Sequence, residues 1–192
     1  TLAKERGRSR AWLVVEKILL TGERLPQDWG CDGTTGYDFM DEVNALQHDP
    51  AGEAVLAKCW TRLTGRPTDF ADEELMARRE IVGRSFSAQL EACASAWQDI
   101  VGDLVPRPAL RRLLAEFLAH VPVYRTYGTG EVLSDHDSQI LRDVARRAAK
   151  SCLATDRWAV EPLLAAMLTP QPTRGSWPRA MARFQQLSAP VA

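Results

Sequence analysis

A short apolar run that ends in a glutamate constrains this chain more than any other feature. Residues Trp12 to Val15 are apolar and partly β-branched, without helical spacing, which predicts a strand buried on both faces of a parallel sheet. Glu16 follows directly. A carboxylate is costly to place in a core, but α/β barrels put their catalytic groups at this position, at the C-terminal end of a strand. We therefore take Glu16 as the candidate catalytic residue.

The stretch after Glu16 is rich in turn-forming residues and continues to Phe39. Long ordered loops at a barrel mouth usually line a pocket. Aromatic faces beside short polar side chains suit a sugar ring, whose apolar C–H faces are edged by hydroxyls. The residues alone leave an alternative open, in which the loop is an ordinary turn, a threonine caps a helix and the aromatics fill a core. The candidate sugar-binding residues of this stretch are Trp29, Asp32, Thr34, Thr35, Tyr37 and Asp38.

The rest of the chain is predicted to be mainly helical, because its apolar residues recur at helical spacing between caps and breakers. Asp49-Pro50, Thr68, Ser134 and either Thr155 or Asp156 are predicted helix starts, and Gly65 is a predicted helix end. The segment that reaches Val101 is either one long helix or two helices broken near Gly83. The predicted helices span about 39–48, 50–65, 68–101, 109–120, 134–153, 156–167 and 178–187, and 121–127 is predicted to be extended.

Composition argues against several classes of function. The 192 residues carry a formal net charge of −1, so no overall field attracts nucleic acid or an anionic membrane. We interpret the pairs Arg111-Arg112 and Arg146-Arg147 as solvated helix faces. The cysteines are scattered, without the paired spacing of a zinc or redox site. No apolar run approaches the roughly 20 residues of a membrane span and no signal peptide is visible, so we expect a cytoplasmic location.

Five stretches carry a resemblance to a known family. VVEKIL (14–19), GERLPQDW (22–29) and DGTTGYDF (32–39) occur in this order, and PVYRTY (122–127) and RFQQLSAPV (183–191) follow them. Together they resemble maltooligosyl trehalose synthase, a family within the α-amylase superfamily of glycoside hydrolases. DGTTGYDF is the most specific of the five, because neither a common fold nor a common cofactor site produces it.

The resemblance implies a retaining, double-displacement mechanism. In this family the glutamate of the VEKIL stretch is the general acid/base, which corresponds to Glu16. The nucleophilic aspartate lies on the preceding strand and a third carboxylate lies beyond Val191, so we expect this chain to be inactive without the rest of the barrel. The implied reaction converts the reducing-end α-1,4 bond of a maltooligosaccharide to an α,α-1,1 bond. The product, maltooligosyl trehalose, would pass to a maltooligosyl trehalose trehalohydrolase. No metal or organic cofactor is implied.

The implied fold is mainly α, with helical insertion domains added to one strand and the active-site loop of an α-amylase-type (β/α)8 barrel. The expected domains are a barrel fragment over 1–38, a first helical subdomain over 39–120, and the extended segment with a second helical subdomain over 121–192. The chain opens inside a charged segment and stops where an apolar stretch begins. We therefore expect a piece excised from a larger enzyme.

Further candidate residues have structural alternatives. Lys17, Tyr124 and Arg125 complete the predicted substrate-binding set; an arginine flanked by aromatics can donate to sugar hydroxyls, and the alternative for Arg125 is an ion pair at a helix junction. The run 135–137 (DHD) resembles a metal cluster, but acidic residues in the first turn of a helix are explained by the helix dipole. For the whole chain, two alternatives stand beside the synthase: a non-catalytic helical module that binds a glucan or another protein, and another α-glucan hydrolase or transferase.

Overall fold

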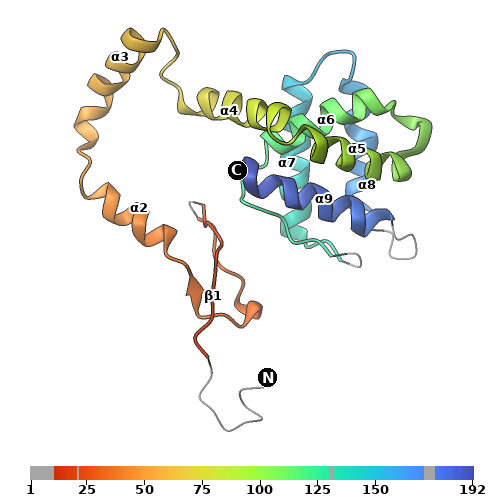
Figure 1. Cartoon of the computed structure of the whole chain (residues 1–192), viewed down its shortest axis with the longest axis horizontal. Helices are drawn as coiled ribbons and strands as arrows, with labels where there is room; N and C mark the ends of the chain where they lie inside the picture. The colour runs from red at the N-terminus through yellow and green to blue at the C-terminus, as the bar shows by residue number, and fades with distance from the viewer. Residues whose placement is uncertain (1–10, 21, 130–131, 171–175) are drawn as a thin grey trace. The chain divides into compact units, whose positions relative to one another are not determined.

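The computed structural model describes residues 11–20, 22–129, 132–170 and 176–192, and the chain is mainly helical, as predicted (Figure 1). It divides into two compact units, which we call unit 1 (residues 1–68) and unit 2 (residues 69–192). The expected domain boundaries were 38/39 and 120/121, whereas the units meet at 68/69. Helices on both sides of residue 120 share a single hydrophobic core in unit 2.

Unit 1 combines a small parallel sheet with two helices. The two strands pair in parallel, with Val14 opposite Gly33 and Val15 opposite Thr34. Its elements are β1 (Val14–Val15), the 3-10 helix η1 (Gln27–Trp29), β2 (Gly33–Thr34), α2 (Tyr37–Ala45), the 3-10 helix η2 (Pro50–Gly52) and α3 (Glu53–Thr64).

Local sequence signals explain where α3 begins and ends. The Asp49 side chain accepts a 2.9 Å hydrogen bond from the Ala51 amide and so caps η2, which leads into α3. Gly65 ends the helix with φ +69°, a left-handed conformation that favours glycine. Both predictions are confirmed.

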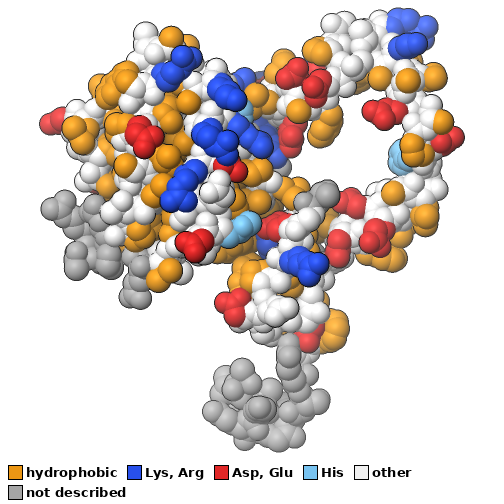
Figure 2. Space-filling model, turned by 180° about the vertical axis from the view of Figure 1, so that it is seen from behind, with side chains coloured by type: hydrophobic (Ala, Val, Ile, Leu, Met, Phe, Trp, Pro, Cys, Tyr) orange, Lys and Arg blue, Asp and Glu red, His pale blue; other side chains and the backbone are white. Residues whose placement is uncertain are grey.

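The prediction that the first strand is buried on both faces is wrong for the chain described here. Trp12 is 78% exposed and Leu13 is 52% exposed. Among the described residues β1 pairs with β2 alone, and a sheet of two short strands cannot cover both of its faces. The helices α2 and α3 also contain no buried residue and present apolar side chains to solvent, visible in orange in Figure 2.

Unit 2 is an all-helical body. The long helical pattern is broken in two near Gly83, and Asp69, not Thr68, caps the first of the two helices by accepting a 2.9 Å hydrogen bond from the Ala71 amide. Its elements are α4 (Phe70–Arg84), α5 (Ser87–Val101), the 3-10 helix η3 (Gly102–Leu104), α6 (Arg107–Ala119), α7 (Asp135–Ser151), the 3-10 helix η4 (Arg157–Ala159), α8 (Val160–Leu168) and α9 (Ser176–Val191).

The helix α5 lies at the centre of the unit 2 core, where it packs against α4, α6, α8 and α9. Trp97 on α5 and Trp177 on α9 are fully buried, as are Phe117 on α6 and Phe184 on α9. Cys93 is also fully buried, and this burial raises the pKa of its thiol to about 12. Large apolar side chains from four or more helices therefore hold unit 2 together by burial.

Residues 121–127, which follow α6, are non-helical, as predicted, and are tied to the helices by side chains. The Asp137 carboxylate accepts a 3.0 Å hydrogen bond from the Tyr127 amide, and the Ser188 hydroxyl donates to the Tyr124 carbonyl at 3.2 Å. Ser134 caps α7, as predicted, by accepting from the Asp137 amide. None of the helices that the structure describes combines the length and apolar content needed to cross a membrane.

Candidate active-site segment

The candidate site begins with the pairing of β1 and β2, which the sequence did not predict. The DGTT stretch (32–35), expected to be loop, runs beside the first strand. The Asp32 amide donates to the Leu13 carbonyl at 2.6 Å, and the Asp32 carboxylate accepts from the Leu13 amide at 2.7 Å. The Thr35 amide donates to the Val15 carbonyl at 3.1 Å. Asp32 therefore fixes the strand that leads to Glu16.

Glu16 and Tyr37, two predicted site residues, are brought together. Glu16 follows β1 directly, and Tyr37 begins α2. The Tyr37 hydroxyl donates to Glu16 Oε1 at 3.3 Å, although the two residues are 21 positions apart. Glu16 is exposed, while Tyr37 is half-buried. The arrangement presents a carboxylate to solvent and orients it with one phenolic hydroxyl, which is a geometry suited to proton transfer.

Lys17 is buried whereas its neighbour Glu16 is exposed, which agrees with the alternation of side chains along an extended chain. Its side chain is 2% exposed, and its ammonium lies 2.5 Å from Glu23 Oε1. Glu23 Oε2 in turn accepts from the Leu20 amide at 3.2 Å. Glu23 could not be predicted as a partner of Lys17, because no local pattern links a lysine after a strand to a glutamate six residues later. The pair anchors the start of the loop to the end of β1.

The turn between β2 and α2 is fixed by Thr34. Its hydroxyl donates to Asp38 Oδ1 at 2.9 Å and accepts from the Gly36 amide at 3.2 Å. Asp38 lies in the first turn of α2, where a carboxylate is also stabilised by the helix dipole. Thr35 is exposed, and Trp29, at the end of η1, is half-buried. Predicted sugar-binding residues of this stretch therefore also shape the turn that carries them.

Tyr124 and Arg125 belong to unit 2, whereas Glu16 belongs to unit 1. The Arg125 guanidinium lies 5.7 Å from the centre of the Tyr127 ring, a cation–π contact. The Arg125 Nε is buried, without a hydrogen-bond partner among the described residues. Asp137, from the run that resembled a metal cluster, holds the Tyr127 backbone instead. The described residues contain no group of three or more His, Cys, Asp or Glu side chains that could hold a metal ion.

No protein-family model matches the chain. Curated relatives from two strains of Mycobacterium tuberculosis, CDC 1551 / Oshkosh and ATCC 25618 / H37Rv, are named "Putative maltooligosyl trehalose synthase". Each is 30% identical to this chain over 119 residues, which are 60% of this chain and 15% of the relative.

A solved structure, the DSM5389 glycosyltrehalose synthase, also matches, with a TM-score of 0.54 and 25% sequence identity. The match covers 81% of this chain and 20% of that one. The resemblance to maltooligosyl trehalose synthase is therefore confirmed in both sequence and structure. The chain spans a fifth or less of the length of these proteins, and the place of β1 in a barrel stays a prediction.

Proposed function

We propose that this chain is part of an intramolecular transglucosylase that converts the reducing-end α-1,4 bond of a maltooligosaccharide to an α,α-1,1 bond, giving maltooligosyl trehalose. The observation that carries the proposal is the exposed Glu16 carboxylate at the end of a parallel strand, oriented by the Tyr37 hydroxyl, in a chain similar to synthases of that name. Those names support a role in trehalose synthesis.

In the proposed reaction Glu16 is used twice. As an acid it protonates the glycosidic oxygen while a carboxylate from outside this chain attacks the anomeric carbon, so that the glucose at the reducing end is released. As a base, Glu16 then removes the proton from the 1-hydroxyl of that glucose, which attacks the same anomeric carbon and displaces the nucleophile. The exposure of Glu16 fits a group that exchanges protons with a bound sugar.

The freed glucose must turn over without leaving, and water must be kept from the covalent intermediate. The loop between β1 and α2 is suited to this task, because the ion pair of Lys17 with Glu23 and the Thr34 hydrogen bonds give it a defined shape. The maltooligosaccharide substrate, the remaining barrel and the downstream trehalohydrolase belong to the same proposal, as does the inactivity of the chain by itself.

The test is Glu16→Gln in the full-length protein, assayed with maltopentaose for maltooligosyl trehalose and for free glucose. Both products should fall by about a thousandfold, because the substitution removes the proton that both steps need. Glu42→Gln, on α2, is the matched control and should leave both rates unchanged. Activity of Glu16→Gln close to that of the wild type would refute the assignment.

One observation favours a second candidate, a non-catalytic module that binds a glucan or another protein. The helices of unit 1 expose aromatic side chains: Phe39 is 68% exposed, and Trp60 is 41% exposed. Exposed aromatic rings can stack on sugar rings or on a partner surface. A full-length protein that binds maltopentaose but releases neither product would support this candidate over the synthase.

A further inference from the structure

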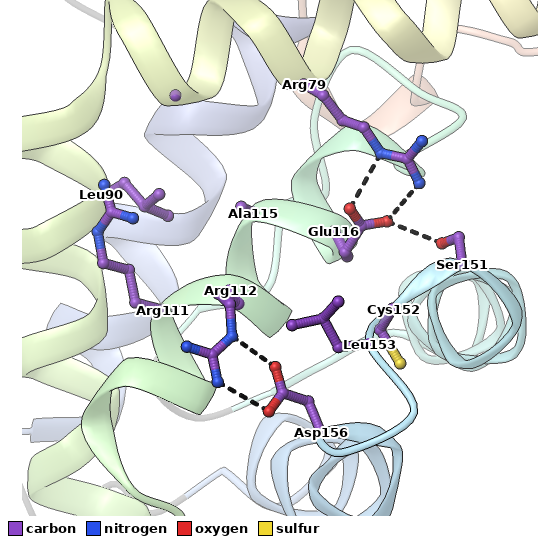
Figure 3. Close-up of a pocket in the computed structure, with 11 residues that line it drawn as sticks. Arg79, Leu90, Arg111, Arg112, Ala115, Glu116, Ser151, Cys152, Leu153 and Asp156 are labelled. Atoms are coloured by element: carbon purple, nitrogen blue, oxygen red, sulfur yellow. Dashed lines mark hydrogen bonds and ion pairs between the residues drawn. The ribbon is translucent and has the colours of Figure 1, made fainter.

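Unit 2 contains a pocket of about 350 Å³ that none of the predicted site residues lines. It lies between α4, α6 and the turn that follows α7, and its volume falls in the about 300–1,000 Å³ range of small-molecule sites. Figure 3 shows how its side chains lie: two arginine–carboxylate pairs face the pocket, and Leu153 lies between them. The pocket therefore offers ordered polar groups around an apolar patch.

The polar groups are held in fixed orientations. Arg79 on α4 donates to both oxygens of Glu116 on α6, at 2.9 and 2.7 Å, and the Ser151 hydroxyl adds a third hydrogen bond to Glu116 at 2.7 Å. Arg112 donates in the same two-pronged way to Asp156, at 2.6 and 2.8 Å. Each guanidinium has five N–H donors, and these bonds use two of them. The other donors can serve a ligand.

The charges in the pocket favour a neutral ligand over an anion. The third arginine, Arg111, is also paired, with its Nε 3.3 Å from Glu91. A phosphate group would enter beside the carboxylates of Glu116 and Asp156, which repel it, and would gain an arginine only by breaking an ion pair. A hydroxyl-bearing ring has no such cost, because it can accept from the outer N–H groups and donate to the carboxylates.

The apolar part of the lining fits the same kind of ligand. Leu153 borders the pocket and is 57% exposed, so it supplies an accessible apolar surface. The C–H faces of a sugar ring are apolar, so a leucine surface with polar groups around it matches both parts of the ring.

Gly83 is an independent indication that the pocket is kept open. It lies inside α4, where glycine is less favourable than alanine by roughly 0.8–1 kcal/mol. Close packing does not require it, because a Cβ built on Gly83 meets no atom within 4 Å. Gly83 lines the pocket, so a side chain at this position would extend into the open space beside it.

We propose that this pocket binds a glucose residue of an α-glucan, so that unit 2 contains a carbohydrate-binding site of its own. The choice of glucose rests on the proposed function, while the preference for a neutral ring rests on the pocket alone. The site would hold a glucan chain through unit 2 in addition to any contact that the chain makes around Glu16.

The test uses Cys152, which lines the pocket, as a reporter in the full-length protein. Its alkylation by iodoacetamide is followed by peptide mass spectrometry with and without maltotriose. A bound ring should slow the reaction of Cys152 by roughly threefold or more, in proportion to occupancy. Cys93 should stay unmodified throughout, because it is buried and its thiol pKa is about 12, and it reports that unit 2 remains folded.

Two variants test the site without removing an ion pair. Gly83→Leu fills the pocket, and Leu153→Asp removes its exposed apolar surface; both should abolish protection by maltotriose. Arg84→Leu is the matched control, because Arg84 neighbours Gly83 on α4, is 79% exposed and does not line the pocket. It should keep full protection.

The results that would contradict the pocket site differ from the results that would contradict the proposed function. Protection that is absent in the wild type, or that persists in both pocket variants, would overturn the site even if Glu16→Gln abolishes product formation. Stronger protection by inorganic phosphate than by maltotriose would overturn the preference for a neutral ring. Protection that is lost only in the pocket variants, in a protein whose activity survives Glu16→Gln, would support the site and refute the catalytic assignment.

Discussion

Arg112 and Asp156 form a two-pronged ion pair, with Nε 2.6 Å from Oδ2 and Nη2 2.8 Å from Oδ1, and so join α6 to the turn before η4 across 44 residues. The Asp156 side chain is 5% exposed, whereas that of Arg112 is 46% exposed. The hydrogen bonds from Arg112 hold the pKa of the Asp156 carboxyl below its usual value. The half-exposed Arg112 therefore supplies hydrogen bonds to the nearly buried carboxylate of Asp156.

Removing Arg112 should destabilise unit 2, because Arg112→Ala leaves the Asp156 carboxylate without the partner that compensates its burial. We expect a loss of about 1–2 kcal/mol in the free energy of unfolding, at the low end for a buried charge because solvent screens the half-exposed arginine. Urea denaturation measures it. Arg146→Ala, which removes a 71% exposed arginine from its pair with Asp143, is the control and should leave the midpoint unchanged. Equal effects of the two substitutions would contradict the prediction.

His120 should make the stability of unit 2 fall in mild acid. Its Nε2 lies 2.8 Å from the Ser151 hydroxyl, and its pKa is lowered from 6.5, chiefly by burial, with Glu116 opposing the shift and Arg79, Arg147 and Arg78 adding to it. The unfolded chain therefore binds a proton near pH 6.5 before the folded chain does, so stability declines as the pH falls below about 7.

The measurement is the melting temperature between about pH 7.5 and 5.5. His120→Gln keeps a hydrogen-bonding side chain but cannot be protonated, so its melting temperature should decline less over this interval than that of the wild type. His136→Gln, at the exposed start of α7, is the matched control for loss of a histidine. Identical pH profiles for His120→Gln and the wild type would show that another group is responsible.

Two glycines of unit 2 should respond in opposite directions to alanine. Gly83→Ala should raise the free energy of unfolding by about 0.5–1 kcal/mol, because the position is helical and a Cβ meets open space. Gly102→Ala should lower it by about 1 kcal/mol or more, because Gly102 ends α5 with φ +60° and ψ −148°, a conformation that alanine rarely adopts. Chemical denaturation of both variants gives the two signs, and a stability loss in Gly83→Ala would contradict the open space seen beside α4.

Tyr37 should affect the proposed reaction through Glu16. Tyr37→Phe keeps the ring and removes the hydroxyl that donates to Glu16 Oε1. If the hydroxyl orients the acid/base, kcat for maltopentaose should fall by about fivefold while KM changes little, since one hydrogen bond is worth about 1 kcal/mol. Tyr127→Phe is the control in unit 2. A rise in KM at constant kcat would instead indicate that Tyr37 contributes to substrate binding alone.

Local signals in the sequence predicted several helix ends correctly. The features that were not predicted depend on residues far apart in the sequence. Ser134, Asp49 and Gly65 act within a few residues of themselves, so their capping roles were predictable. Asp156 was one of two residues predicted to cap a helix, the other being Thr155, but its side chain makes no cap hydrogen bond and binds Arg112 instead. Arg112 lies 44 positions from Asp156 in the sequence, so no local pattern reveals their pairing.

In the candidate site, too, local features could be predicted and contacts between distant residues could not. A carboxylate directly after an apolar strand could be recognised at Glu16 from composition and order alone. Its contact with Tyr37, and the ion pair of Lys17 with Glu23, depend on how the loop folds back on β1. The pairing of β2 with β1 was not predicted, because a two-residue strand rich in glycine and threonine looks like a turn.

The order of the helices in unit 2 has a consequence for how the chain is made. The apolar face of α5 that packs against α9 is covered last, because α9, which supplies Trp177 and Phe184, follows every other described helix of the core in the sequence. During translation the earlier helices therefore emerge with this apolar face open, and the core closes after residues 176–191 have left the ribosome. The nascent chain should be most exposed to aggregation, and most dependent on chaperones, in the interval before α9 arrives.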